Sequence, residues 1–110
     1  MTEQLLAIIV ATKDAMKIYD AAKKYTPTIE QILILQNALI QTGNGLYIYN
    51  FACDIPGADI PLLQDAVLKS GSISTIEMFA NHVPGADKKR LMYEVKRLKK
   101  EKFTENNIAW

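Results

Sequence analysis

The stretch that decides the fold is FACDIPGAD at residues 51–59, which returns 28 residues later as FANHVPGAD at residues 79–87. The two copies differ at three positions, and one of these exchanges Ile for Val. The same offset continues upstream, where LQNALIQTG at residues 35–43 matches LQDAVLKSG at residues 63–71. Self-similarity at such a period is the signature of proteins built from stacked structural repeats.

Each repeat contains two segments with apolar residues at helical spacing, a longer one and a shorter one. The shorter segment has an earlier copy, because IYDAA at residues 18–22 matches IYNFA at residues 48–52 with an offset of 30. We therefore expect pairs of helices whose core residues include Leu35, Leu39, Phe51, Leu63, Val67 and Phe79. The predicted helices cover about residues 2–12, 14–25, 28–42, 45–54, 59–70, 74–82 and 87–103.

Turn and capping signals separate these segments. Pro56-Gly57 and Pro84-Gly85 suit the centre of a type II turn, and Asp59 and Asp87 are then placed to cap the following helices. Further signals are the predicted capping boxes Thr28–Gln31 and Ser74–Glu77 and the helix-ending glycines Gly43 and Gly71.

The strings YIYNFA at residues 47–52, GAD at 57–59 and LQDAV at 63–67 resemble a short HEAT-like α-helical repeat of about 28 residues with a Gly-Ala-Asp turn. Such repeats occur in tandem in uncharacterised bacterial and phage proteins. The resemblance covers about residues 18–99. It departs at the first copy, which lacks Gly-Ala-Asp, and at the last, which is rich in Lys and Arg. It implies an α-superhelix and brings no catalytic residues.

Repeat and resemblance together predict an all-α fold. Helix pairs repeated in tandem stack because one pair alone cannot bury its apolar face. We expect an α-solenoid of about three helix-pair repeats plus a basic terminal helix. The predicted domain covers residues 1–103, and residues 104–110 form a C-terminal tail.

The composition narrows the class of protein. The chain has 110 residues and a formal charge of +1, and 49% of its residues are apolar, which is typical of one globular domain. The longest apolar run, residues 5–11, is too short to span a membrane and has no basic residue before it, so it does not match a secretory signal. A single cysteine favours a reducing, cytoplasmic location.

Little material for catalysis is present, and we expect neither an enzyme nor a cofactor or metal site. Cys53 and His82 fall out of register on neighbouring repeats, which argues against a nucleophile–base pair. The Pro-Gly-Ala-Asp motif lacks the Lys and Ser or Thr of a phosphate loop. Lys24, Asp54 and His82 occupy equivalent positions, so either Asp54 pairs with one of its neighbours or all three are solvated.

Two sets of residues are candidates for binding a protein. Tyr19 and Tyr49 align, and because Glu77 stands at the same position of the next repeat, we expect both tyrosines to face outward. The first helix is apolar nearly all round, so we expect Leu6 and Ile9 to contribute to an exposed patch. Three covers for that patch remain open: a second copy in a homodimer, a partner, or the tail ending in Ile108 and Trp110.

The last predicted helix is strongly basic. Residues 1–87 carry a net charge of −4 and residues 88–110 carry +5. The candidate basic patch comprises Lys88, Lys89, Arg90, Lys96, Arg97, Lys99 and Lys100. It serves either as a polar cap of the solenoid or as a site for a nucleic-acid backbone or an acidic protein. The interleaved Glu94 and Glu101 weaken the nucleic-acid case.

Our functional prediction is a non-enzymatic protein-interaction module with a protein partner. The resemblance to phage repeats suggests the narrower hypothesis of an inhibitor of a host defence protein, of the anti-CRISPR kind. The alternative is nucleic-acid binding through the basic C-terminal helix.

Overall fold

Helices make up all the regular structure in the residues that the structure, a computed structural model, describes: 1–70 and 72–108, with side chains up to Lys102. The prediction of an all-α fold is confirmed for this part of the chain. The helices are α1 (Glu3–Ala11), α2 (Ala15–Lys24), α3 (Ile29–Thr42), α4 (Gly45–Asp54), α5 (Ile60–Ser70), α6 (Ile73–His82) and α7 (Lys88–Ile108).

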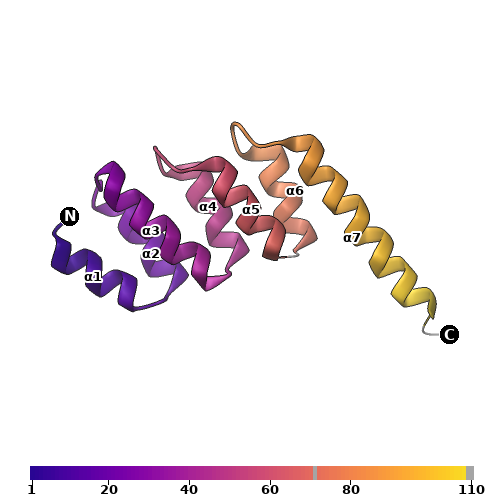
Figure 1. Cartoon of the computed structure of the whole chain (residues 1–110), viewed down its shortest axis with the longest axis horizontal. Coiled ribbons are helices and arrows are strands. Elements are labelled where there is room, and N and C mark those ends of the chain that lie inside the picture. The colour runs from indigo at the N-terminus through magenta and orange to yellow at the C-terminus, as the bar shows by residue number, and fades with distance from the viewer. Residues whose placement is uncertain (71, 109–110) are drawn as a thin grey trace.

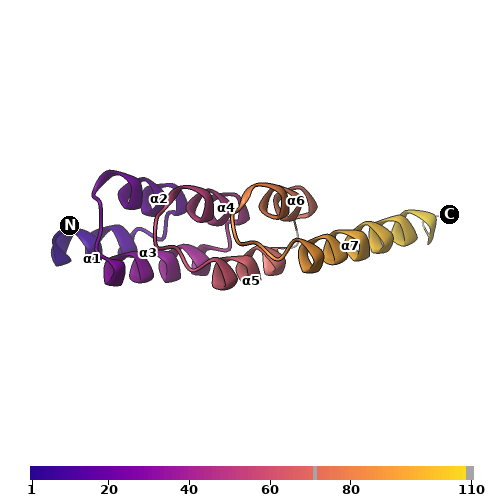
Figure 2. The ribbon, with the colours of Figure 1, turned by 90° about the horizontal axis from the view of Figure 1, so that it is seen from above.

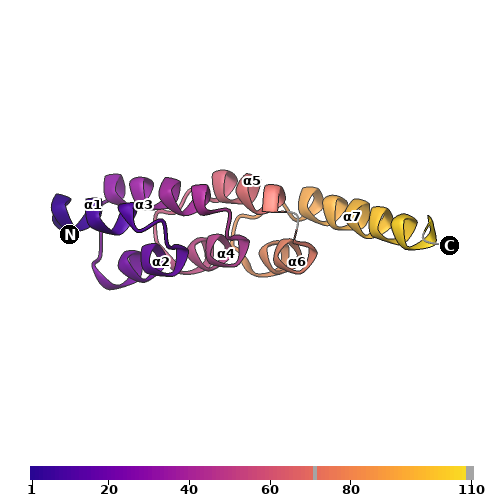
Figure 3. The same ribbon diagram turned by 90° about the horizontal axis from the view of Figure 1, so that it is seen from below.

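The helices form two layers. Helices α1, α3, α5 and α7 lie in one, which we name the odd layer, and α2, α4 and α6 lie in the other, the even layer (Figures 2 and 3). Helix α4 packs against α2 and α6 in its own layer and against α3 and α5 in the odd layer. The result is elongated, 56 × 28 × 16 Å, with α1 and the end of α7 at opposite ends (Figure 1).

The apolar core lies between the two layers. Phe51 of α4 and Phe79 of α6 are completely buried, as the repeat predicts. The other four predicted core residues, Leu35, Leu39, Leu63 and Val67, are also completely buried. The register of the sequence repeat therefore identifies the inner side of helices α3 to α6.

Two equivalent turns lead into α5 and α7. Gly57 and Gly85 have φ angles of 84° and 81°, which glycine adopts without steric cost. In each turn the carbonyl before Pro-Gly accepts a hydrogen bond from the N–H three residues later, at 3.2 Å, which confirms the predicted turns. The carboxylates of Asp59 and Asp87 then accept a hydrogen bond from the third residue beyond them, also at 3.2 Å.

A buried glutamine joins each of these turns to the preceding helix of the odd layer. Oε1 of Gln36 in α3 accepts a hydrogen bond of 2.8 Å from the backbone N–H of Asp59. Twenty-eight residues later, Oε1 of Gln64 in α5 accepts the same bond from Asp87, again at 2.8 Å. Both glutamines are buried. The sequence alignment places Gln36 opposite Gln64 but does not reveal this shared partner.

Most predicted helix ends are correct, and one is not. The capping box of Thr28 and Gln31 is present, and Gly43 is left-handed with φ 70°, whereas Gly71 lies outside the described residues. The box of Ser74 and Glu77 was predicted wrongly, because α6 begins earlier with Ser72 as its N-cap. Glu77 is instead bonded to Lys99 of α7 at 3.2 Å.

Helix α7 continues through Ile108, so the boundary predicted at residue 103 is wrong. Its last described turns hold no glycine or proline, and Arg97 supports the helix by an ion pair with Glu101 one turn later. Residues 109–110, which complete the predicted tail, lie outside the described residues. Among the residues that are described, no helix combines the length and the apolar character needed to cross a membrane.

Replacing Phe51 by Ala should destabilise the fold by about 3–5 kcal/mol, because a buried ring is lost and the rigid surroundings leave a cavity. Urea unfolding followed by far-ultraviolet circular dichroism measures the change. Leu46→Ala on the same helix is the control, since Leu46 is 49% exposed and should cost less than about 0.5 kcal/mol. Equal effects of the two variants would contradict the placement of the core.

Replacing Gln64 by Leu should cost about 1–3 kcal/mol, because the N–H of Asp87 loses its acceptor. The same change at exposed Gln41 should be close to neutral. Gln36→Leu should cost less than Gln64→Leu, since Nε2 of Gln36 is buried without a hydrogen-bond partner and its removal offsets part of the loss. Urea unfolding of the three variants gives the order, and an equal cost for Gln41 and Gln64 would contradict the role of Gln64.

Candidate functional site

Tyr19 joins two helices of the even layer and is not free. Its hydroxyl donates a hydrogen bond to the carboxylate of Asp54 in α4, and its ring lies 5.7 Å from that of Tyr47. Nζ of Lys23 lies 5.5 Å from the centroid of the same ring. Tyr19 is only half-buried, so it forms part of the surface, but it contributes first to the contact between α2 and α4.

Asp54 therefore has a different partner from those expected. Neither Lys24 nor His82 is the residue that bonds to it, although all three share one repeat position. The Tyr19 side chain spans the gap between the helices diagonally, whereas Lys24 places its Nζ 5.3 Å from the ring centroid of Tyr25. The prediction of a charge pair along this file of residues is wrong.

Tyr49 and Cys53 lie one turn apart on α4 and interact with each other. Burial raises the pKa of Tyr49, and the neighbouring Cys53 and Asp54 raise it further. Burial and the charge of Asp54 also raise the pKa of the Cys53 thiol, against the opposing effect of its hydrogen bond to Tyr49. Cys53 is exposed but is held as a thiol, and a thiol is a poor nucleophile and a poor metal ligand.

The part of the chain with described side chains does not gather the groups of a metal centre. It holds no cluster of three or more His, Cys, Asp or Glu side chains placed to bind an ion. Carboxylates close to one another on α7, Glu94 and Glu101, share the guanidinium of Arg97.

Helix α1 turns Leu6 and Ile9 inward, so the prediction that they contribute to an exposed patch is wrong. They are 7% and 9% exposed because α1 packs against both α2 and α3. The large apolar side chain that α1 leaves in solvent is Ile8, at 64%. Ile108 does not cover it, since α7 ends at the other end of the molecule (Figure 1); Trp110 lies outside the described residues.

Four exposed aliphatic side chains follow the outer side of the odd layer. We name them the apolar row: Ile8 of α1, Leu33 and Ile34 of α3, and Leu62 of α5. Ile34 and Leu62 are 47% and 42% exposed and stand 28 residues apart, at equivalent positions. At 100° per residue they lie on the side of their helices away from the core residues Leu35 and Leu63. The sequence analysis missed the row because it sought the core stripe alone.

The basic residues of α7 divide into two groups. Arg90 pairs with Asp65 of α5 at 2.9 Å, Lys99 with Glu77 of α6 at 3.2 Å, and Arg97 with Glu94 and Glu101 at 2.7 and 2.6 Å. The bonds to Glu94 and the charge of Glu101 raise the pKa of Arg97. Lys88, Lys89 and Lys96 are exposed and form no ion pair with the described residues. The predicted patch is thus only partly available to a ligand.

A search of family models, of curated proteins and of solved structures finds no match to this chain.

Raising the pH above 10 should destabilise the protein through Tyr19. Burial, then the hydrogen bond to Asp54 and the charges of Asp54 and Asp20, raise the pKa of Tyr19 above its ordinary value of 10. Below pH 10 the phenol is neutral in both the folded and the unfolded state. Above pH 10 the unfolded state ionises first, so stability falls until the folded pKa is reached.

The measurement is the urea midpoint between pH 9 and pH 11. Tyr19→Phe should have a shallower decline than the wild type. Asp54→Asn should lie between the two, because burial is the largest cause of the shift and remains in that variant. A slope for Tyr19→Phe equal to that of the wild type would contradict the assignment.

Proposed function

We propose that the chain is a short α-solenoid of about three helix pairs, closed by the basic helix α7, and that it acts as a protein-interaction module without enzymatic activity. The solenoid arrangement is supported by the successive packing of α2 on α4 and of α4 on α6, with α3 and α5 beside them. Equivalent glutamines at positions 36 and 64 make equivalent bonds to the next turn. Solenoids offer extended surfaces to partners.

The apolar row is the observation that carries the proposal. Exposed aliphatic side chains that recur at equivalent positions of successive repeats cannot be explained by the packing of the chain with itself. Residues 25–68, which contain Leu33, Ile34 and Leu62, hold no Lys or Arg. Protein interfaces have this composition at their centre, apolar and depleted of charge, and clusters of exposed apolar side chains are typical of docking sites.

A cytoplasmic protein is the expected partner, because the single cysteine of the chain favours a reducing compartment. The narrower hypothesis of a phage-type inhibitor of a host defence protein rests on the repeat resemblance alone. A homodimer remains within the proposal, with Ile8 in the role first given to Leu6 and Ile9. The half-buried Tyr19 and Tyr49 are a second, smaller candidate surface on the even layer.

Substitutions in the apolar row should abolish partner capture while the fold is retained. Ile34→Glu and Leu62→Glu each place a charge at the centre of the surface, and partner binding should weaken at least tenfold, because a desolvated unpaired charge costs several kcal/mol. Leu46→Glu is the matched control on the even layer, since Leu46 is 49% exposed and Ile34 47%. Tagged protein is used to capture host proteins, and the bound proteins are quantified by mass spectrometry.

The proposal predicts a set of proteins captured by the wild type and by Leu46→Glu but lost in both variants of the row. Loss in all three variants, or in none, would contradict it. Light scattering of the same four proteins tests whether the partner is a second copy: a dimer that Ile8→Glu and Ile34→Glu dissociate would identify the row as the homodimer interface.

A further inference from the structure

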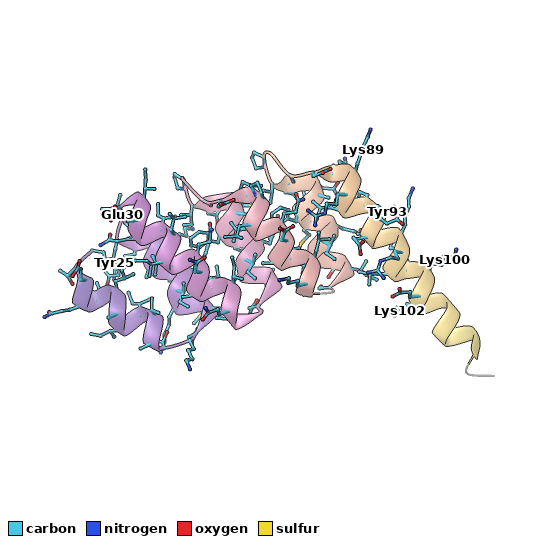
Figure 4. The ribbon with its side chains drawn as sticks, viewed as in Figure 1. Tyr25, Glu30, Lys89, Tyr93, Lys100 and Lys102 are labelled. Carbon is cyan, nitrogen blue, oxygen red and sulfur yellow. The ribbon has the colours of Figure 1, made fainter. Side chains whose placement is uncertain are left out.

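We propose that α7 carries a second binding site, for single-stranded nucleic acid, along a basic stripe formed by Lys89, Tyr93, Lys96 and Lys100. These residues follow one another at helical intervals of four, three and four, so they lie in one file along the helix. All four are exposed, Tyr93 to 68%. Figure 4 shows Lys89 and Lys100 projecting from α7 away from the other helices.

The carboxylates near α7 are held away from this stripe. Glu94 and Glu101 both bind Arg97, and Asp65 binds Arg90 on the side of α7 next to α5. The two glutamates that weaken the nucleic-acid case in the sequence therefore neutralise an arginine and leave Lys89 and Lys96 without an acidic partner among the described residues. Negative charge on one side of the helix and positive charge on the other make the stripe complementary to a polyanion.

Helix stability does not account for the placement of these cations. Lys88, Lys89 and Arg90 form the first turn of α7, where the helix dipole is positive and basic side chains are unfavourable. The last turn, where basic residues would stabilise the helix, contains none. A cost of this kind is expected where the charges serve binding.

Tyr93 favours single-stranded nucleic acid over an acidic protein as the ligand. Its ring is exposed between Lys89 and Lys96, and it is not among the ring contacts of the described residues. An unpaired base stacks on such a ring while lysines on either side neutralise phosphates. An acidic peptide would use the lysines but gain little from a central tyrosine. The stripe is separate from the apolar row, so this site does not depend on the proposed protein interface.

The experiment is fluorescence anisotropy of the full chain with a labelled mixed-sequence DNA 15-mer, between 50 and 200 mM NaCl. The plot of log affinity against log salt should lose about 0.7 in slope for each phosphate contact removed. Lys89→Gln with Lys96→Gln should therefore flatten the slope by about 1.4. Tyr93→Ala should weaken binding at least about fivefold, as expected for the loss of one stacked base.

The matched control is Arg90→Gln with Arg97→Gln, which removes the same charge from positions already in ion pairs. It should flatten the slope by less than half as much as the stripe variant. Circular dichroism verifies that every variant is folded. Equal losses in the stripe and control variants would show that net charge alone attracts the DNA and would overturn the proposal. So would absence of binding at 50 mM NaCl, or binding of a labelled poly-glutamate peptide that is as tight and as dependent on Tyr93.

Discussion

A buried amide determines how each turn of the chain is set against the helix before it. The N-terminus of a helix presents backbone N–H groups without partners inside the helix, and each needs an acceptor. At α5 the carboxylate of Asp59 supplies one acceptor, and Gln36 of the preceding odd-layer helix supplies another to the N–H of Asp59 itself. Since a hydrogen bond tolerates little change in length, this contact fixes the separation of α3 and α5 at that point.

The first turn of α3 solves the same problem within one helix. There the N–H of Thr28 donates to Gln31 three residues later, which completes a capping box. Asp59 and Asp87 are followed at that distance by Leu62 and Arg90, which offer no acceptor, so the acceptor comes from the neighbouring helix. The glutamines thus make the start of one helix depend on the presence of the one before it.

The sequence predicts the core well and the surface poorly, for physical reasons. An offset of 28 residues identifies Phe51 and Phe79 as buried because equivalent positions meet equivalent neighbours. Helix α1 is apolar on all sides, so its pattern does not distinguish Ile8, which is exposed, from Leu6 and Ile9, which are buried. The partner of Asp54 was missed because Tyr19 reaches it diagonally, and alignment compares only positions in register.

Separation of charge along the molecule has a consequence for how it meets other molecules. The net −4 of residues 1–87 and the +5 of residues 88–110 lie toward opposite ends of a body 56 Å long. That span is several times the Debye length of about 8 Å at physiological salt, so the ends present separate fields to anything that approaches. A large electric dipole moment of this kind turns the molecule during diffusion, and its α7 end leads toward a negative surface. The orientation on arrival is then set before any side chain makes contact.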